Sequence, residues 1–279
     1  MKVYLIPNMS KSQAIPVAKR AIEILKALGV EVVLPPQARL DENSHCMPPA
    51  QAYEEADVVL TVGGDGTILH AARAGLVYHK PILGVNLGRT GFLATCEVDQ
   101  LDEKLRLLVE GKYQLDDRMM LDIRVPGYGA WNSMALNDVA VYSSDRRKAT
   151  RYDIYCDGLK VNHFRGDGVV VSTPTGSTGY SLSAGGPILD AHISGLIVTP
   201  ICAHSIHVPP IVFSAERRLT ICAQPEGNEN ICFFCDGANE QVLPAGASVE
   251  ITRARHSIQL IEFQAGDQFR AIDEKLRGR

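Results

Sequence analysis

The sequence lacks any apolar run that is long enough to cross a membrane. Its longest apolar stretches, such as 169–171 and 196–201, are far shorter than the roughly 18 residues that a spanning helix needs. Residues 1–10 also lack the apolar core of a secretory signal peptide. We therefore expect a cytoplasmic protein that has no membrane partner.

A strong excess of charge of one sign is also absent. The chain has 28 lysines and arginines against 32 aspartates and glutamates, which gives a formal net charge of −4. Binding to nucleic acid or to an acidic membrane surface normally needs a basic excess or a basic face. The composition therefore argues against nucleic acid as a partner, and its 46% hydrophobic content is that of an ordinary globular protein.

The cysteines do not form a disulfide or metal framework. Seven is an odd number, and only Cys232 and Cys235 form a C-x-x-C pair. The pair lies in a strand-like run, where an odd separation directs the two thiols to opposite faces. A structural zinc needs four ligands, and no second pair is visible. We predict reduced, buried thiols and no protein-bound structural metal.

Residues 1–116 show the alternation of strands and helices that is typical of a mostly parallel, Rossmann-like α/β sheet. The predicted strands are 3–6, 30–34, 58–62 and 81–85. The predicted helices include one that carries the apolar stripe of 14–28, one at 68–76 and one at 101–109. A proline-rich loop is expected before the third strand.

Beyond residue 117 the pattern changes to short alternating runs that are split by turns, which indicates a mainly antiparallel β domain over 117–263. Asp157-Gly158 between two such runs is a strong hairpin signal. Later strands are expected at 196–201, 219–223, 231–235, 249–252 and 258–263. The final segment, 264–279, is a candidate to rejoin the first domain.

Gly63-Gly64-Asp65-Gly66-Thr67 lies between a buried strand and a helix, where glycine amides and the helix N-terminus can hold a phosphate. The segment fits neither the dinucleotide fingerprint nor the P-loop, and a tight turn capped by Asp65 is the alternative. An aspartate among phosphate-binding amides would repel phosphate, unless a metal or a proton transfer involves it.

The run 172–186 follows an apolar strand and is rich in hydroxyls and glycines. Such a loop suits a ligand with sugar hydroxyls, phosphates and a flat base, and a flexible linker is the alternative. Asn137-Asp138 can hold a ribose diol or form an ordinary turn. Arg165-Gly166-Asp167-Gly168 can meet a polar, anionic ligand or form an ion pair at a hairpin end. The segment 86–92 follows the fourth strand, at the edge where open α/β sheets bind ligands.

Taken together, these motifs closely resemble the NAD kinase family, and the resemblance covers nearly the whole chain. GGDGT alone is shared with lipid kinases of the diacylglycerol type, whereas the run from Thr173 to Gly186 is specific. The resemblance implies Mg²⁺-dependent transfer of a phosphoryl group from ATP, or from polyphosphate, to the 2′-hydroxyl of the adenosine ribose of NAD, which gives NADP. Mg²⁺ or another divalent cation is the implied cofactor, and a homodimer or homotetramer in which a neighbour supplies part of each site is the implied assembly.

The resemblance also implies roles for individual residues. Asp65 matches the proton acceptor. The matching substrate-binding positions are Gly64, Gly66, His70, Phe92, Asn137, Asp138, Lys148, Arg165, Asp167, Thr175, Thr178, Gly179, Tyr180, Ser181, Leu182 and Ser183. The chain departs from the family at Asp138, where Glu is usual, at Gly179, where Ala is usual, at Ala203, where Pro is usual, and at Ala238, where Gln is usual. These departures bear on ligand preference and leave the reaction unchanged.

Two other functions compete with this one. A lipid or sugar kinase with the same GGDGT core would be expected to show a basic, membrane-facing amphipathic stretch in the lipid case, and none is evident. A sensor that binds NAD(P) without turnover would keep the pocket, but the intact Asp65 argues against it.

Overall fold

The computed structural model describes residues 1–40, 42, 44–88, 91–128, 132–145, 147–205, 208–225, 229–244, 246–264, 269 and 271–273. The chain divides into two compact units. The first contains Met1–Asp117 and the described part of Ser257–Arg279, and the second contains Arg118–His256. None of the described helices is long and apolar enough to cross a membrane.

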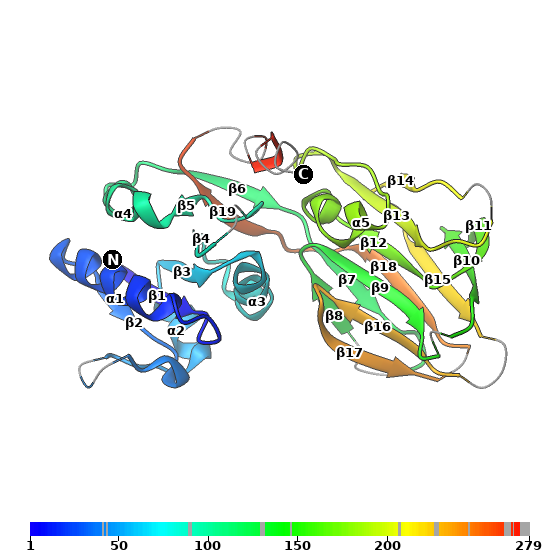
Figure 1. Ribbon diagram of the computed structural model, residues 1–279, viewed down its shortest axis with the longest axis horizontal. Coiled ribbons are helices and arrows are strands. Elements are labelled where there is room, and N and C mark those ends of the chain that lie inside the picture. The colour runs from blue at the N-terminus through cyan, green and yellow to red at the C-terminus, as the bar shows by residue number, and fades with distance from the viewer. Residues whose placement is uncertain are drawn as a thin grey trace. The chain divides into compact units, whose positions relative to one another are not determined.

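The first unit is built on a largely parallel sheet whose strand order, in the described chain, is β2-β1-β3-β4-β19-β6, with β5 paired to β4 (Figure 1). Its strands are β1 (Lys2–Pro7), β2 (Glu31–Val33), β3 (Val58–Gly63), β4 (Ile82–Asn86), β5 (Cys96–Glu97), β6 (Gln114–Arg118) and β19 (Ile258–Glu262). Its main helices are α1 (Ala14–Ala27), α2 (Pro49–Glu55), α3 (Asp65–Gly75) and α4 (Leu101–Val109).

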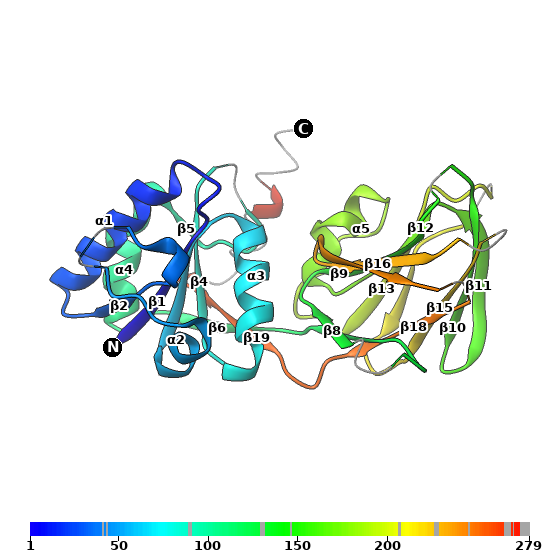
Figure 2. The same ribbon diagram turned by 90° about the horizontal axis from the view of Figure 1, so that it is seen from below.

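Helices lie on both faces of this sheet (Figure 2), and successive side chains of each strand point to opposite faces. On β1, Val3 and Leu5 belong to the core cluster that includes buried residues of α1 and α4. Tyr4, between them, points to the other face and contacts Tyr53 of α2, with the ring centroids 5.0 Å apart. Helix α2 lies where the sequence predicted only a loop. Seven residues show too little periodicity to be recognised, although Pro49 at the first helical position favours a helix start.

Strand β19 corrects the predicted domain boundary. The sequence analysis placed 258–263 in the second domain, whereas β19 pairs in parallel with β4 of the first unit. The alternating pattern of such a strand is the same in either sheet, so it cannot indicate the partner. The chain thus leaves the first unit near Asp117 and returns to it near Ser257.

The second unit consists of two antiparallel sheets, as the pattern predicted. Over the described residues their strand orders are β11-β10-β15-β18-β7-β8 and β14-β13-β12-β9-β16-β17. The strands are β7 (Leu121–Arg124), β8 (Asn132–Ala135), β9 (Asp138–Ser143), β10 (Thr150–Cys156), β11 (Leu159–Gly166), β12 (Gly168–Ser172), β13 (Gly195–Ile201), β14 (Ile211–Ser214), β15 (Leu219–Gln224), β16 (Ile231–Cys235), β17 (Ala238–Leu243) and β18 (Ser248–Arg253).

Alternate residues from both sheets fill the core of this unit. Ile123 and Ile221 come from the sheet that runs from β11 to β8. Val141, Val171 and Phe233 come from the sheet that runs from β14 to β17. Residues from the two sheets form one cluster because each strand directs every second side chain inward.

The predicted hairpin is present, since β10 and β11 are joined by Asp157 and Gly158, both at positive φ. A second turn of the same kind, Asp236-Gly237, joins β16 to β17. On β16 Cys235 belongs to the core cluster, and Cys232 is buried outside it.

Candidate functional site

The glycine turn of the first unit joins β3 directly to α3. The helix begins at Asp65, three residues before the predicted start, and Gly64 in extended conformation precedes it. The Thr67 hydroxyl accepts the Gly64 N–H at 3.4 Å, which closes the turn. A methyl group on Gly63 would lie 2.1 Å from the Thr67 hydroxyl oxygen, so this position excludes a side chain. Asp65 and Gly66 therefore occupy the first helical turn, where the backbone dipole favours an anion.

The Asp65 carboxylate is held by the loop that follows β4. Its two oxygens accept the backbone N–H groups of Phe92 at 2.9 Å and Leu93 at 3.2 Å. Gly91 permits this approach, because a methyl group there would lie 2.3 Å from Asp65 Oδ1. A carboxylate has about four acceptor positions, so the two amides leave room for a substrate hydroxyl. Phe92 thus contributes through its backbone, while Arg89 and Thr90 lie outside the described residues.

Two residues after β1 join this turn, and the sequence analysis missed both. The Asn8 side-chain amide donates to the Thr67 hydroxyl at 3.4 Å. A methyl group on Gly64 would lie 3.3 Å from Lys11 Nζ, which places an ammonium group beside the glycines. Their place in the chain could have indicated this role. Strand β1 pairs in parallel with β3, and polar residues that follow parallel strands gather at the same edge of the sheet. His70 is exposed on α3, five residues after Asp65, so the two do not share a helix face.

In the second unit the Asn137–Asp138 pair lies at the start of β9, opposite the end of β12. Ser172 is the register partner of Asp138. The Thr173 N–H donates to the Asn137 carbonyl at 2.9 Å, and the Thr173 hydroxyl donates to the Leu136 carbonyl at 2.6 Å. These bonds hold the hydroxyl-rich loop against the Asn137–Asp138 pair.

Gly176 allows the closest part of this approach. A methyl group there would lie 2.0 Å from the Asn137 carbonyl oxygen, so the loop backbone can pass only because position 176 is glycine. Gly179 lies nearby, and a methyl group added to it would lie 3.4 Å from Asn137 Nδ2 and 3.5 Å from Asp138 Oδ2. The departure from the family's alanine therefore leaves the volume of a methyl group open beside both polar side chains.

Several buried polar atoms here have no hydrogen-bond partner among the residues that the structure describes. They are Asn137 Oδ1, Ser172 Oγ and Thr175 Oγ1. An unpaired buried polar atom costs about 1–3 kcal/mol, and such atoms are rare in folded proteins. These atoms lie together, just before β9 and at the end of β12 and in the loop that follows it, and such a group is typical of a surface that binds a polar ligand.

Asp138 is unusual for a carboxylic acid. It is 4% exposed, and burial followed by the negative charge of Asp236 raises its pKa to about 7, against the effect of a hydrogen bond from the Tyr180 backbone. The carboxyl group can therefore accept from ribose hydroxyls as an anion and can hold a proton when the pH falls below neutrality.

The rest of the loop divides into inward and outward residues. Thr178 ends the 3-10 turn Thr175–Thr178, and α5 (Tyr180–Ser183) follows. The Ser181 hydroxyl is fully buried and pairs with the Thr199 hydroxyl at 2.8 Å, which gives it an internal partner. Leu182 is half-buried and Ser183 is exposed.

The Tyr180 ring lies at the surface next to this loop. It is 39% exposed and stacks on Phe234, with centroids 6.2 Å apart and an angle of 18° between the planes. A partly exposed aromatic face of this kind can stack on a flat base.

Lys148, Arg165 and Asp167 lie away from this cluster. Asp167 precedes β12 and Ser172 ends it, so five steps of extended chain separate them by about 16 Å. Lys148 forms an ion pair with Glu229 at 3.3 Å, and the Arg165 guanidinium donates to the Ala149 carbonyl at 3.4 Å. The structure thus does not bring these predicted residues to the Asn137–Asp138 pair within one unit.

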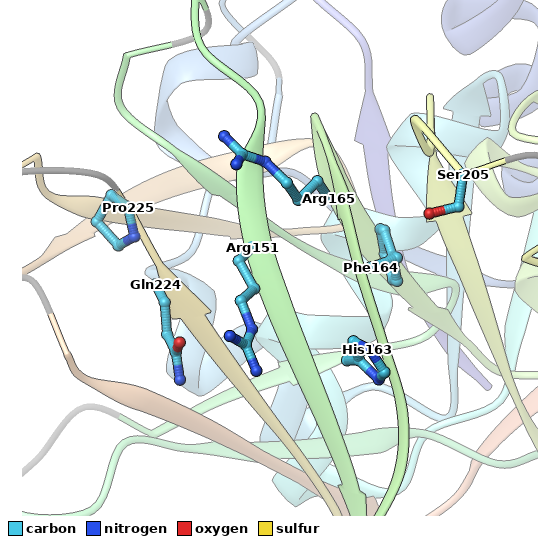
Figure 3. Close-up of a pocket in the computed structure, with 7 residues that line it drawn as sticks. All are labelled: Arg151, His163, Phe164, Arg165, Ser205, Gln224 and Pro225. Carbon is cyan, nitrogen blue, oxygen red and sulfur yellow. The ribbon is translucent and has the colours of Figure 1, made fainter.

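Arg165 instead lines an open hollow where β10 begins and where β11 and β15 end (Figure 3). Its walls are Arg151, His163, Phe164, Arg165, Ser205, Gln224 and Pro225. Arg151 is partly neutralised by Asp153, at 3.4 Å. Two arginines line the hollow, and its polar side chains are exposed.

Asp236 is the clearest residue that the sequence analysis missed as part of the site. Its carboxylate accepts the backbone N–H groups of Leu136, Asn137 and Asp138 at 3.0, 2.7 and 3.2 Å. These partners are about 100 positions away in the chain. The Asp-Gly dipeptide was visible in the sequence, but only as the first part of a departure from the family's Asp-Gly-Gln.

Comparisons with known proteins agree with this geometry. Residues 3–113 match the model of the ATP-NAD kinase N-terminal domain, and residues 136–263 match that of the ATP-NAD kinase C-terminal domain. The NAD kinase of Moorella thermoacetica is 34% identical over 281 residues, which cover 99% of this chain and 89% of the relative. That of Mycobacterium tuberculosis is 38% identical over 237 residues, or 84% of this chain and 73% of the relative.

Two solved structures share the fold. An NAD kinase from Archaeoglobus fulgidus in complex with ATP gives a TM-score of 0.80 at 28% identity and is covered, like this chain, over 100% of its length. Yeast NADH kinase complexed with NADH gives a TM-score of 0.89 at 24% identity, over 99% of this chain and 87% of that one. With both domain models matched and relatives that align along nearly the whole length, the chain belongs to the NAD kinase family and is a kinase, that is, a phosphotransferase.

Proposed function

We propose that the protein transfers the γ-phosphoryl group of ATP to the 2′-hydroxyl of the adenosine ribose of NAD, which gives NADP and ADP. The observation that carries the proposal is the Asp65 carboxylate, fixed by two amide N–H groups at the start of a helix that leaves a glycine turn. Family membership supplies the class of substrate.

Asp65 is the proposed proton acceptor. As the ribose 2′-oxygen bonds to the γ-phosphorus, the bond from that phosphorus to the β,γ-bridging oxygen breaks and ADP leaves. The hydroxyl proton passes to Asp65. A loose phosphoryl-transfer transition state needs mainly alignment and neutralisation of charge. The Lys11 ammonium beside Gly64 suits the second task.

A divalent cation, Mg²⁺ in the first instance, is part of the proposal. Mg²⁺ is usually held by one or two carboxylates together with substrate phosphates, rather than by a cage of protein ligands. The chemistry of the turn fits this arrangement, since Asp65 offers a carboxylate next to glycine amides. When bound, the cation would neutralise charge on the phosphates. Activity should disappear with a chelator and return with added Mg²⁺.

The second unit is the proposed NAD site. Asp138 would accept hydrogen bonds from the hydroxyls of a ribose, and Asn137 Oδ1 and Thr175 Oγ1 would gain the partners that they lack among the described residues. Tyr180 would stack on a base. Asp138→Ala should therefore mainly raise the KM for NAD, because it removes binding rather than chemistry.

Lys148, Arg165 and Asp167 would act in the site of a second copy, in a homodimer or homotetramer. The support is that Asp167 lies at the other end of β12 from the Asn137–Asp138 pair, that Arg165 lies at the end of β11 just before it, and that Lys148 follows the far end of β9. Complementation tests this arrangement. Asp138→Ala and Arg165→Ala should each have low activity alone. When the two variants are mixed at random, half of the dimers contain one copy of each, and each of these dimers has one intact site out of two. The mixture should therefore show about a quarter of wild-type activity. No regain would place all these residues in one chain's site.

The deciding experiment measures NADP formation by the purified protein with NAD, Mg²⁺ and either ATP or polyphosphate. Asp65→Asn should keep the melting temperature and lose activity by at least about 100-fold, the low end of general-base effects. Activity within a few-fold of wild type would remove Asp65 from this role. NAD binding without turnover on either donor would favour the sensor, and no NAD binding would favour a lipid or sugar kinase.

A further inference from the structure

The turn between β16 and β17 carries more than a hairpin needs. Asp236 and Gly237 have φ values of 51° and 68°, and a two-residue turn with both residues at positive φ accepts Asn or Gly at its first position as readily as Asp. The turn itself therefore does not require the carboxylate of Asp236.

That side chain fills a nest of backbone donors. Three consecutive N–H groups, at 136, 137 and 138, converge on the Asp236 carboxylate at 2.7–3.2 Å. In return the Asp236 N–H donates to the Asp138 carbonyl at 2.9 Å. Successive N–H groups of this kind form a concave anion site, here occupied by the protein's own carboxylate.

We propose that Asp236 is a positioning residue for nucleotide binding, whose carboxylate fixes the backbone that presents the Asn137 and Asp138 side chains to NAD. This inference rests on the proposed function of the second unit. It explains why Asn137 Oδ1 stays buried without a partner in the described part of the chain, since the bonds to Asp236 hold the backbone that carries it. Asp236 itself would not touch the substrate.

The same carboxylate affects the charge of its neighbour. Burial and the negative charge of Asp236 raise the pKa of Asp138, and the hydrogen bond from the Tyr180 backbone N–H lowers it. NAD binding that needs ionised Asp138 should weaken as the pH falls below about 7. Removal of the Asp236 charge should move this acidic limb to lower pH.

The chain offers a matched control. Asp157-Gly158 forms the same type of turn between β10 and β11, at φ values of 51° and 81°. Asp157 also accepts a backbone N–H, that of Arg218 at 3.0 Å, and pairs with Arg217 at 2.8 Å. Asp157→Asn therefore makes the same chemical change in an equivalent turn of the other sheet.

The experiment compares Asp236→Asn, Asp157→Asn and wild type by NAD binding at equilibrium, by the KM for NAD and for ATP, and by the pH profile of NAD affinity. Loss of charged hydrogen bonds to the nest should weaken NAD binding at least about tenfold at neutral pH. The KM for ATP should change little, and the acidic limb of the pH profile of NAD affinity should move to lower pH. Asp157→Asn should resemble wild type in all of these.

Unchanged NAD affinity in folded Asp236→Asn would overturn the proposal. A loss of affinity with an unmoved acidic limb and a lower melting temperature would also overturn it, because a purely structural role predicts that result. If Asp236→Asn does not fold, Asp236→Gly keeps the turn and removes the carboxylate. Failure of both to fold would assign Asp236 to the fold and not to positioning.

The proposed function is tested separately within the same series. Wild type that binds NAD without making NADP would refute the kinase reaction, while the binding comparison would still decide the role of Asp236. Wild type that binds no NAD would overturn both.

Discussion

Replacement of Asp138 by Asn should change how the stability of the protein depends on pH. Asp138 is 4% exposed, and burial and Asp236 raise its pKa from 3.8 to about 7. Between these values the folded protein holds a proton that the unfolded chain has released. The free energy of unfolding must therefore fall as the pH rises through this window. Asn has nearly the same shape, cannot ionise and can still accept the Tyr180 N–H, so the variant should lack this contribution.

The magnitude follows from the size of the shift. Each pKa unit corresponds to about 1.4 kcal/mol, so a shift from 3.8 to about 7 amounts to about 4 kcal/mol. This is a substantial part of the roughly 5–15 kcal/mol that stabilises a typical domain. The contribution is complete below about pH 4 and is lost by about pH 8. The free energy difference, variant minus wild type, should increase by about 4 kcal/mol across that range.

Urea titrations of both proteins at several pH values from 4.5 to 8 measure this difference directly, and groups other than Asp138 cancel in the comparison. Asp157→Asn is the control, because its backbone bond from Arg218 and its pairing with Arg217 lower the pKa of Asp157. Stability that depends on a lowered pKa is lost only as the pH falls below the ordinary value of 3.8. The control difference should therefore stay flat. Parallel curves for Asp138→Asn and wild type would refute the reasoning.

Further predictions concern the glycine turn. Gly91→Ala would place a methyl group 2.3 Å from Asp65 Oδ1, so it should displace the carboxylate and lower kcat roughly 100-fold, whereas a methyl group on Gly88 meets nothing within 4 Å and Gly88→Ala should be active. Equal activity of the two variants would show that the position of the carboxylate does not matter. Lys11→Ala should raise the KM for ATP roughly tenfold, with a smaller effect on the KM for NAD, which steady-state kinetics with each substrate varied would establish. A change confined to NAD would assign Lys11 to the other substrate.

The sequence and the structure agree most closely where a residue's role depends on its neighbours in the chain. The helix stripe of α1 includes the buried residues Ala14, Ala18 and Leu25 at the predicted spacing. Asp157-Gly158 predicted a hairpin because the turn needs positive φ at two adjacent positions. The strand, glycine turn and helix around Asp65 were also visible, although the helix starts three residues early because glycine and threonine close its first turn.

The site was harder to predict because its parts come from distant segments. The Asp65 carboxylate is fixed by Phe92 and Leu93, 27 and 28 positions later, and nothing in the local pattern of either segment indicates the other. Lys11 was missed for the same reason. A lysine in a loop after the first strand is ordinary until the parallel pairing of β1 and β3 brings it next to Gly64.

By itself the sequence determined the class of each half of the chain, the order of most elements, and the motifs that resemble the NAD kinases, since all of these follow from local periodicity, turn chemistry and residue identity. Only the tertiary structure decided that β19 joins the parallel sheet, that Asp236 reaches across about 100 positions to Asn137–Asp138, and that Arg165 lies at the opposite end of β12 from them. Strand pairing and close approach depend on which surfaces fit together in three dimensions. An alternating pattern specifies that a strand has a buried face, but not which strand lies beside it.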